Sequence, residues 1–395
     1  MCFKYDFWGM TDVLTNNLSF WEKDTWFDQV DVAIIGSGLV GLSAAIAIKQ
    51  QSPRLKVLVL ERGALPSGAS TKNAGFACFG SASELLDDLS KQGEELTWET
   101  VYMRWNGLRN LRELLGDAAI GYEGLGGYEL FREADKDLYE ASLDQLPELN
   151  RRLKEVIGKT AVFRPSNDKI GDFGFGGGAK HMILNSAEGQ IHTGKMMLAL
   201  TRKAQEVGVL LVHGITLTTL EQEEGGVVLV MSDGWKFKAR KALLCTNGFA
   251  AQLMPQLDVV PARNQVLITQ PIAGLKVNGC FHYDKGYFYL RNIDNRILIG
   301  GGRHLSPEVE QTAAFGTTEL IRNALRDLLD TVFLPGVSWE EDFWWSGILG
   351  VGNSKKPLIE WVDTHIAVAV RMGGMGVAIG SLVGARGAKL ISETL

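Results

Sequence analysis

Cysteine is scarce in this chain. Its 395 residues include only four cysteines, and no two of them form a C-x-x-C pair. Widely spaced cysteines of this kind indicate neither a disulfide framework nor a zinc site. The sequence therefore predicts a protein of a reducing compartment, the cytoplasm, with no metal site.

Positive charge and long apolar runs are also lacking. Lys and Arg number 40 against 46 Asp and Glu, a net charge of −6. This acidic balance argues against nucleic acid or an anionic membrane surface as the main partner. Charges or paired glycines interrupt every stretch long enough to span a bilayer, and the N-terminus has no clean apolar leader. We therefore expect neither a membrane span nor a signal peptide.

Glycine is abundant, and the most informative glycines follow an apolar run at residues 32–35. The turn reads Gly36-Ser-Gly38-Leu-Val-Gly41, and an Ala- and Ile-rich stretch and a second apolar run ending at Glu61 come after it. Gly36 permits a tight turn, Gly38 lets the backbone approach a pyrophosphate, and Gly41 lets helix pack on strand. This order of a strand, a glycine turn, a helix, a second strand and an acidic residue at its end predicts a dinucleotide-binding unit.

The position of Glu61 narrows the choice of nucleotide. It lies 20 residues past Gly41, where a carboxylate accepts hydrogen bonds from the ribose hydroxyls of an adenosine and disfavours a 2′-phosphate. FAD and NAD share the adenosine diphosphate half, so this motif alone does not separate them.

The length of the chain favours two domains around separate cores. The pattern predicts an α/β protein with a discontinuous, Rossmann-like nucleotide-binding domain and an α+β substrate domain that has a mixed or antiparallel sheet. The predicted boundaries are 1–29 for an aromatic N-terminal lead-in; 30–118, 186–258 and 340–395 for the nucleotide-binding domain; and 119–185 and 259–339 for the substrate domain.

Three later segments resemble one flavoprotein family. They are the loop 68–77 (GASTKNAGFA), the strand end 245–248 (CTNG) and the turn 373–376 (GGMG) before a final apolar helix. In this order they resemble the D-amino-acid oxidase/glycine oxidase family of FAD-dependent oxidoreductases, over residues 31 to 395. The resemblance implies FAD as the cofactor. Residues 346–357 hold no cysteine for a covalent link, so noncovalent FAD is expected.

The resemblance also implies which residues surround FAD. The turn before the last helix would direct backbone N–H groups at the flavin, where reduction places negative charge. Close packing of helix on strand is the alternative explanation of those glycines. The implied cofactor-binding residues are Gly36, Ser37, Gly38, Val40, Gly41, Glu61, Arg62, Gly68, Ala69, Ser70, Thr71, Asn73, Ala74, Gly75, Leu217, Thr246, Asn247, Gly248, Gly347, Arg371, Met372, Gly373, Gly374, Met375 and Gly376.

The candidate catalytic residues come from the second domain. Alternation along a strand places Tyr287 and Tyr289 on one face, and Arg303 and His304 follow the next strand. The family places a carboxylate-binding arginine where this chain has Leu349, so Arg303 is the candidate to bind an anionic substrate group. Core packing of the tyrosines and a solvated Arg303 are the alternatives.

The family's chemistry implies an FAD-dependent enzyme that oxidises a C–N bond of an amine or amino acid by hydride transfer to the flavin. The strand 297–300 lacks the lysine that sarcosine oxidases use for oxygen, so the electron acceptor is O₂ or an unknown compound. A 2-hydroxy-acid or polyol dehydrogenase and a non-catalytic nucleotide-binding protein remain alternatives. An aromatic cluster, at residues 339 and 343–345, is either a cage for a cationic amine or domain packing.

Overall fold

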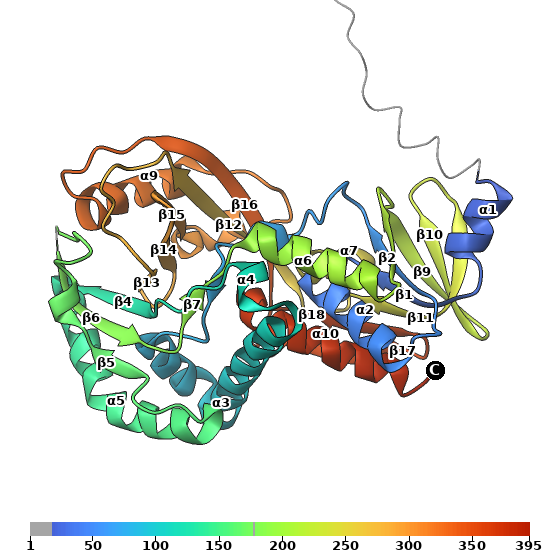
Figure 1. Cartoon of the computed structure of the whole chain (residues 1–395), viewed down its shortest axis with the longest axis horizontal. Coiled ribbons are helices and arrows are strands. Elements are labelled where there is room, and N and C mark those ends of the chain that lie inside the picture. The colour runs from blue at the N-terminus through green and yellow to red at the C-terminus, as the bar shows by residue number, and fades with distance from the viewer. Residues whose placement is uncertain (1–17, 177) are drawn as a thin grey trace, which may run out of the picture.

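Two large β-sheets organise the described part of the chain, residues 18–176 and 178–395, in a computed structural model (Figure 1). The first sheet lies at the right of Figure 1 and the second at the left. The fold is mixed α/β with more than one sheet, which confirms the predicted fold class. Both sheets have eight strands in these residues.

The first sheet is mainly parallel and contains the glycine turn. Its order is β17-β18-β11-β1-β2-β8, and β10 and β9 continue from β11 as an antiparallel hairpin. The central strands are almost wholly apolar and buried, as expected for a parallel sheet covered on both faces. The strands are β1 (Val30–Ile35), β2 (Val57–Glu61), β8 (Leu210–His213), β9 (Leu217–Glu223), β10 (Gly226–Met231), β11 (Lys236–Leu244), β17 (Leu358–Asp363) and β18 (Ile366–Val370).

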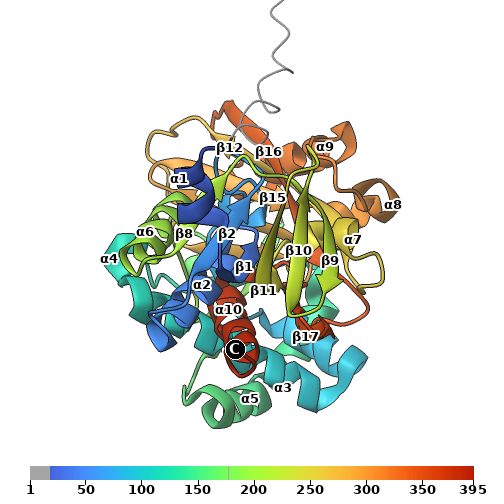
Figure 2. The ribbon, with the colours of Figure 1, turned by 90° about the vertical axis from the view of Figure 1, so that its right-hand side faces the viewer.

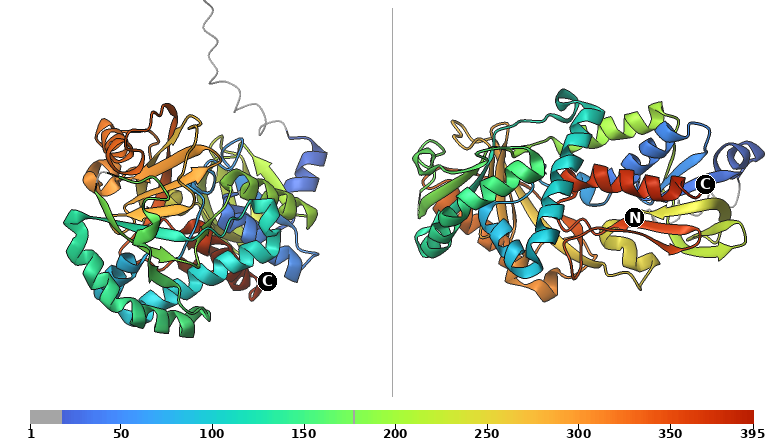
Figure 3. Two further views of the ribbon diagram at one scale, coloured as in Figure 1. Left: turned by 60° about the vertical axis from the view of Figure 1, so that its left-hand side comes forward. Right: turned by 90° about the horizontal axis from the view of Figure 1, so that it is seen from below.

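Three helices cover one face of this sheet: α2 (Leu39–Gln51), α6 (Thr193–Glu206) and α10 (Gly376–Ser392). They lie side by side when the molecule is seen from below (Figure 3, right). Gly384 in α10 allows close contact, since a Cβ there would come within 2.5 Å of the Val40 carbonyl oxygen. Helices α2 and α10 thus pack directly on each other, which brings together two segments that are far apart in the sequence.

The second sheet is antiparallel except for the parallel pair β13/β4, and its order is β16-β12-β15-β14-β13-β4-β6-β5. This agrees with the predicted mixed or antiparallel sheet. Its strands are β4 (Gly127–Arg132), β5 (Phe163–Pro165), β6 (Ala179–Asn185), β12 (Val260–Thr269), β13 (Cys280–Tyr283), β14 (Phe288–Ile293), β15 (Arg296–Gly301) and β16 (Glu341–Val351). A short pair, β3 (Phe76–Ala77) and β7 (Gly189–Gln190), lies apart from both sheets.

Two long helices pack with the second sheet, α3 (Ala82–Leu115) and α5 (Lys136–Ile157). Ser81 caps α3 by accepting a hydrogen bond from the Glu84 N–H, and Gly93 interrupts the helix with a φ of +80°. The remaining helices are short: α1 (Phe20–Glu22), α4 (Asp117–Ile120), α7 (Ala250–Leu253), α8 (Pro307–Glu310) and α9 (Glu319–Leu328). In Figure 2, α1 lies at the end of the first sheet that faces the viewer.

One strand belongs to a different sheet from the one that its predicted domain implies. Residues 340–395 were assigned to the nucleotide-binding domain, but β16 pairs with β12 along its whole length and so belongs to the second sheet. Its apolar and aromatic composition does not reveal which partner strand it joins, because pairing is a long-range property. The chain returns to the first sheet only at β17.

The predicted N-terminal lead-in is only partly described, because residues 1–17 lie outside the described part of the chain. Within the rest, Phe27 is buried and its ring lies 4.5 Å from that of Trp235. Phe20 and Trp21 are exposed.

Candidate functional site

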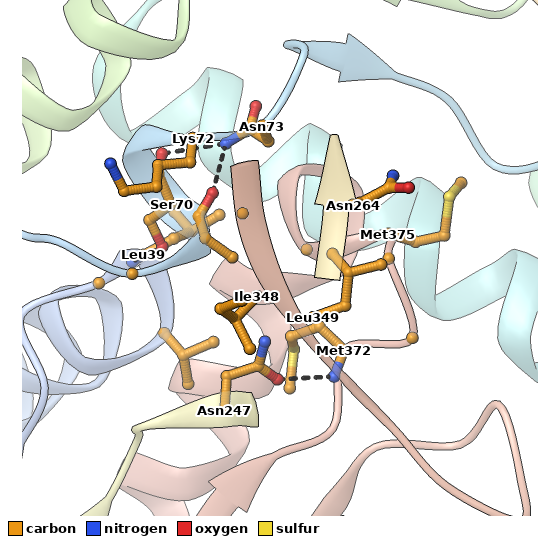
Figure 4. Close-up of a pocket in the computed structure, with 18 of the residues that line it drawn as sticks. Leu39, Ser70, Lys72, Asn73, Asn247, Asn264, Ile348, Leu349, Met372 and Met375 are labelled. Carbon is orange, nitrogen blue, oxygen red and sulfur yellow. Dashed lines mark hydrogen bonds between the residues drawn. The ribbon is translucent and has the colours of Figure 1, made fainter. Parts of the chain in front are cut away.

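A cavity of about 800 Å³ runs between the two sheets. Its wall begins at the glycine turn after β1, passes the loop before β3 and the turn before α10, and ends at β13, β14 and the start of α3. Segments far apart in the sequence therefore meet along one elongated space. Figure 4 shows the middle of this cavity, with Ser70 and Asn73 on one side and Asn247 and Met372 on the other.

The glycine turn has the geometry that a pyrophosphate requires. Gly36 has a φ of +104°, and a Cβ at Gly41 would come within 2.0 Å of the Gly36 carbonyl oxygen. A Cβ at Gly38 would come within 2.9 Å of the Ser70 Oγ, which accepts a hydrogen bond from the Leu39 N–H. Side chains are thus excluded where backbone N–H groups and the N-terminus of α2 face the cavity.

Glu61 lines the cavity and also fixes the turn. One carboxylate oxygen accepts hydrogen bonds from the N–H and the hydroxyl of Ser37, at 3.2 and 2.9 Å. The other accepts from the Gly63 N–H and the Ser67 hydroxyl, at 3.0 and 3.2 Å. Ser37 is therefore turned toward Glu61 and does not line the cavity. From the sequence, only a ribose contact is expected for Glu61, and this link between the two strand ends is not.

Asn73 holds the next loop in shape. Its amide nitrogen donates to the carbonyl oxygens of Ala69 and Ser70, and its Oδ1 accepts from the Gly75 N–H at 2.8 Å and from the Thr193 hydroxyl at 2.9 Å. Because its own polar atoms are used, Asn73 presents the loop backbone to the cavity (Figure 4).

The turn before α10 closes the opposite wall. Asn247 accepts a hydrogen bond from the Met372 N–H at 3.1 Å, and the next two residues, Gly373 and Gly374, have φ of +58° and +86°. The 17-residue helix α10 begins at Gly376, so its positive N-terminal end faces this part of the cavity. The placement of this turn at the flavin, which the family resemblance implied, stays a prediction.

Most of the implied cofactor-binding residues line the cavity: Gly36, Gly38, Val40, Glu61, Arg62, Gly68, Ala69, Ser70, Asn73, Ala74, Gly75, Leu217, Thr246, Asn247, Gly347, Met372, Gly373, Gly374, Met375 and Gly376. Five lie behind the wall instead: Ser37, Gly41, Thr71, Gly248 and Arg371.

The residues behind the wall act through their neighbours. The Thr71 hydroxyl donates to the Pro66 carbonyl oxygen at 2.6 Å. A Cβ at Gly248 would come within 2.4 Å of the Leu349 carbonyl oxygen, so this glycine permits close strand packing. Arg371, with a φ of +67°, donates to the Lys356 carbonyl oxygen and pairs with Asp258. Arg371 thus shapes the turn before α10, and its predicted cofactor-binding role stays a prediction.

Three of the four candidate catalytic residues line the far end of the cavity, namely Tyr287, Tyr289 and Arg303. The Tyr289 hydroxyl accepts a hydrogen bond from the Asn264 side chain at 3.0 Å, and burial raises the pKa of Tyr289. The Arg303 guanidinium lies 5.9 Å from the centre of the Tyr287 ring and forms no ion pair within the described part of the chain.

His304 does not line the cavity. It forms an ion-pair contact of 3.1 Å with Asp284, and the centre of its ring lies 4.3 Å from that of the Tyr287 ring, with the two planes tilted by 37°. Burial lowers its pKa, with Asp284 opposing the shift. His304 thus supports Tyr287 from behind.

The aromatic cluster does not form a cage. Phe343 is exposed, and Trp344 lies against the Arg322 and Arg326 guanidiniums. Trp345 donates to the Lys72 carbonyl oxygen at 3.0 Å and so braces the loop beside the cavity. None of these aromatic side chains is among the described residues that line the cavity. Domain packing, the alternative explanation, fits their positions.

Several cavity residues were missed from the sequence. The far end of the cavity is lined by Phe76, His282 and Lys355. It is also lined by Glu84 and Asp88 of α3. Lys355 pairs with both of these carboxylates, at 3.1 and 2.6 Å. These groups come from elements far apart in the chain, and only the fold brings them together.

Two buried polar atoms show that the cavity fits a ligand with polar groups. Thr246 Oγ1 and Asn264 Oδ1 are buried in its wall without a hydrogen-bond partner in the described part of the chain. Buried polar atoms are nearly always paired, so these two fit a ligand that supplies the partners. The glycine turn, the N-termini of α2 and α10 and these two unpaired atoms together fit FAD.

Comparison with known proteins agrees with this geometry. A bifunctional protein ThiO/ThiG from Synechocystis sp. is 26% identical over 323 residues, which are 80% of this chain and 44% of that protein. The chain thus matches less than half of that relative's length. The structure of an L-proline dehydrogenase from P. horikoshii superimposes with a TM-score of 0.74 at 17% identity, covering 92% of this chain and 94% of the other.

A second solved structure, of glycine oxidase from Geobacillus kaustophilus, superimposes with a TM-score of 0.73 at 20% identity and covers 92% of this chain and 95% of the other. These two structures show the shared fold. Among the described residues, no helix is long and apolar enough to cross a bilayer. The model of the family described as FAD dependent oxidoreductase (DAO) matches residues 31–390. The chain therefore belongs to the DAO family of FAD-dependent oxidoreductases.

Proposed function

We propose that this FAD-dependent oxidoreductase oxidises the C–N bond of an amine or amino acid. The observation that carries the proposal is the continuity of the cavity, which joins the glycine turn to a far end lined by aromatic and charged side chains. Glycine oxidase and L-proline dehydrogenase, which share the fold, act by their names on amino acids, and this supports the substrate class.

Bound FAD supplies the two-electron acceptor for this chemistry. The protein holds it noncovalently, as Cys78 and Cys245, the two cysteines in the cavity wall, are buried thiols whose pKa burial raises. The turn at 373–376 and the N-terminus of α10 provide fixed N–H dipoles, which stabilise developing negative charge without reorganisation.

Arg303 is the proposed anchor for an anionic group of the substrate. Leu349, which replaces the family's carboxylate-binding arginine, lines the cavity and offers only apolar contact. Arg303 lies at the far end, where a planar guanidinium can bind a carboxylate through two hydrogen bonds. Tyr287 and Tyr289 provide the apolar sides of the substrate space, and His304 supports Tyr287.

Three further points belong to the proposal. The electron acceptor is O₂ or another compound, since β15 has no lysine to assist oxygen. The first sheet and its helices form the FAD-binding domain, and the second sheet belongs to the substrate domain. The boundaries are the predicted ones, except that β16 is counted with the substrate domain. The location is cytoplasmic, as the cysteine pattern predicts.

Flavin bleaching tests the proposed function. The purified protein is mixed under argon with a panel of secondary amines, D- and L-amino acids and 2-hydroxy acids, and the flavin absorption is followed. Loss of the oxidised-flavin bands with an amine or amino acid is the expected result. Bleaching by hydroxy acids alone would assign the alternative dehydrogenase function, and no bleaching by any donor would indicate a non-catalytic protein.

A further inference from the structure

A histidine and a glutamate form a buried pair at the far end of the cavity. His282 Nε2 lies 3.2 Å from the Glu188 carboxylate, and the two residues are 6% and 1% exposed. His282 lines the cavity, and its ring packs 5.3 Å from that of Phe76. The pair thus joins a titratable ring in the cavity wall to a carboxylate behind it.

Glu188 is held rigidly toward the histidine. Its other oxygen accepts hydrogen bonds from the backbone N–H groups of Phe79 and Gly80, both at 3.1 Å. With Nε2 bound to Glu188, Nδ1 is the ring nitrogen for which no partner occurs among the described residues. A carboxylate that fixes one imidazole nitrogen leaves the other as the proton acceptor.

The surroundings of His282 are mainly acidic. Glu129 of β4 lies opposite it in the parallel strand pair, and Glu84 approaches from α3. Burial alone would lower the pKa of His282, but Glu188, Glu84 and Glu129 together raise it above the usual value. The charged and titratable groups around the ring are Glu188, Glu84, Glu129, Cys78 and Tyr289, with Arg104 and Lys355 bound to Glu84.

We propose that His282 is the proton acceptor for the substrate amine and that Glu188 is its positioning residue. The inference rests on the proposed function. An ammonium group has no lone pair to assist loss of a hydride from the neighbouring carbon, so the amine must first be neutral. One N–H bond of the ammonium breaks, its electron pair stays on nitrogen, and the proton forms a bond to Nδ1 of His282. The resulting imidazolium stays paired with Glu188.

Metal binding is the competing explanation of the same cluster. The ligand atoms of Cys78, Glu188 and His282 all lie within 4.8 Å of one another. However, burial and then the charge of Glu188 raise the pKa of the Cys78 thiol well above its usual value, and a metal needs the thiolate. The Glu188 carboxylate is already occupied by two N–H groups and the imidazole, so the proton-acceptor role fits better.

The test is the pH dependence of flavin reduction by an amine that bleaches the wild-type protein. Protonated His282 cannot accept a proton, so kcat/KM should fall as the pH drops through its pKa, which lies above the ordinary 6.5. His282→Gln should keep its FAD and lower kcat/KM about 10²- to 10⁴-fold near neutral pH. It should also lose the fall of kcat/KM at low pH, which is the acid limb of the profile. Glu188→Gln should shift the acid limb to lower pH, because it removes the charge that favours the imidazolium.

His181→Gln is the matched control, since His181 stacks on Tyr139 and is not among the cavity-lining residues. NMR of isotope-labelled histidine gives a second readout, and the titration of His282 should coincide with the acid limb. An unchanged profile in His282→Gln, while amines still bleach the flavin, would overturn the inference and leave the proposed function standing. Loss of activity with EDTA and recovery with Zn²⁺ would overturn it in favour of a metal site. Bleaching by hydroxy acids alone would refute both.

Discussion

At the scale of single residues, Gly38 carries the prediction for cofactor binding. A branched side chain there would meet the Ser70 hydroxyl, 2.9 Å from the Cβ position, and fill the space where the backbone faces the pyrophosphate. We predict that Gly38→Val abolishes FAD retention, measured as the flavin-to-protein ratio after gel filtration. Gly171→Val, at an exposed position with no atom within 4 Å of the added Cβ, is the control. Equal flavin content in Gly38→Val and wild type would show that the cofactor lies elsewhere.

Arg303 carries the prediction for substrate binding. If the substrate is anionic, Arg303→Leu should raise its apparent KM roughly tenfold to a hundredfold, about 1.4–2.8 kcal/mol, and leave the FAD content unchanged. Arg109→Leu changes an exposed arginine of α3 and should leave KM as in wild type. Unaltered kinetics in Arg303→Leu would point to a neutral or cationic amine as the substrate.

Glu61 fixes the glycine turn and is predicted to bind the ribose, and the effect expected of its removal follows from both. Glu61→Ala removes the acceptor for Ser37, Gly63 and Ser67 together with the predicted ribose contact. FAD binding should weaken by about 1–3 kcal/mol, the scale of lost charge-assisted hydrogen bonds. Equilibrium titration of the apoprotein with FAD measures this change, and an unaltered dissociation constant would contradict it.

Local motifs revealed one end of the site and not the other. The glycine turn and Glu61 were predictable because their function depends on residues close together in sequence. His282 and Glu188 are 94 residues apart, and neither stands in a motif. They meet because β13 pairs with β4 and β4 pairs with β6, which Glu188 follows in the chain. No local pattern encodes these long-range contacts.

At the scale of elements, helix α3 contains the clearest strained position. Gly93 has φ +80° and ψ 174°, a region open to glycine alone, and it separates the cavity-lining start of the helix from its long remainder. Gly93→Ala should lower the free energy of unfolding by about 1–3 kcal/mol, measured by denaturant titration. Gly171→Ala, where φ is not positive, should have no such effect. An unchanged unfolding midpoint in Gly93→Ala would show that the kink relaxes at no cost.

Elements with strong local signals were well predicted. The β1–α2–β2 unit occurs as its glycine turn and flanking apolar runs indicate. The assignment of β16 failed because an apolar strand is compatible with either sheet, and its partner β12 lies about 80 residues earlier in the chain.

At the scale of the whole molecule, the arrangement of the two sheets creates the site. The two segments proposed to contact the cofactor, at the start of α2 and of α10, meet because these helices pack together, although they lie more than 300 residues apart. The second sheet then closes the cavity with residues that belong to no cofactor motif. The fold class was predictable from the nucleotide unit and the resemblance, whereas the charged far end of the cavity depends on how the sheets meet.

The absorption spectrum of the purified protein, recorded under argon before and after addition of an amine, tests the central claim most directly. We predict the bands of oxidised flavin, their loss on addition of a suitable amine or amino acid, and release of the chromophore into the supernatant on acid precipitation. A colourless protein that binds NAD, or a flavin spectrum that no amine or amino acid changes, would contradict this account.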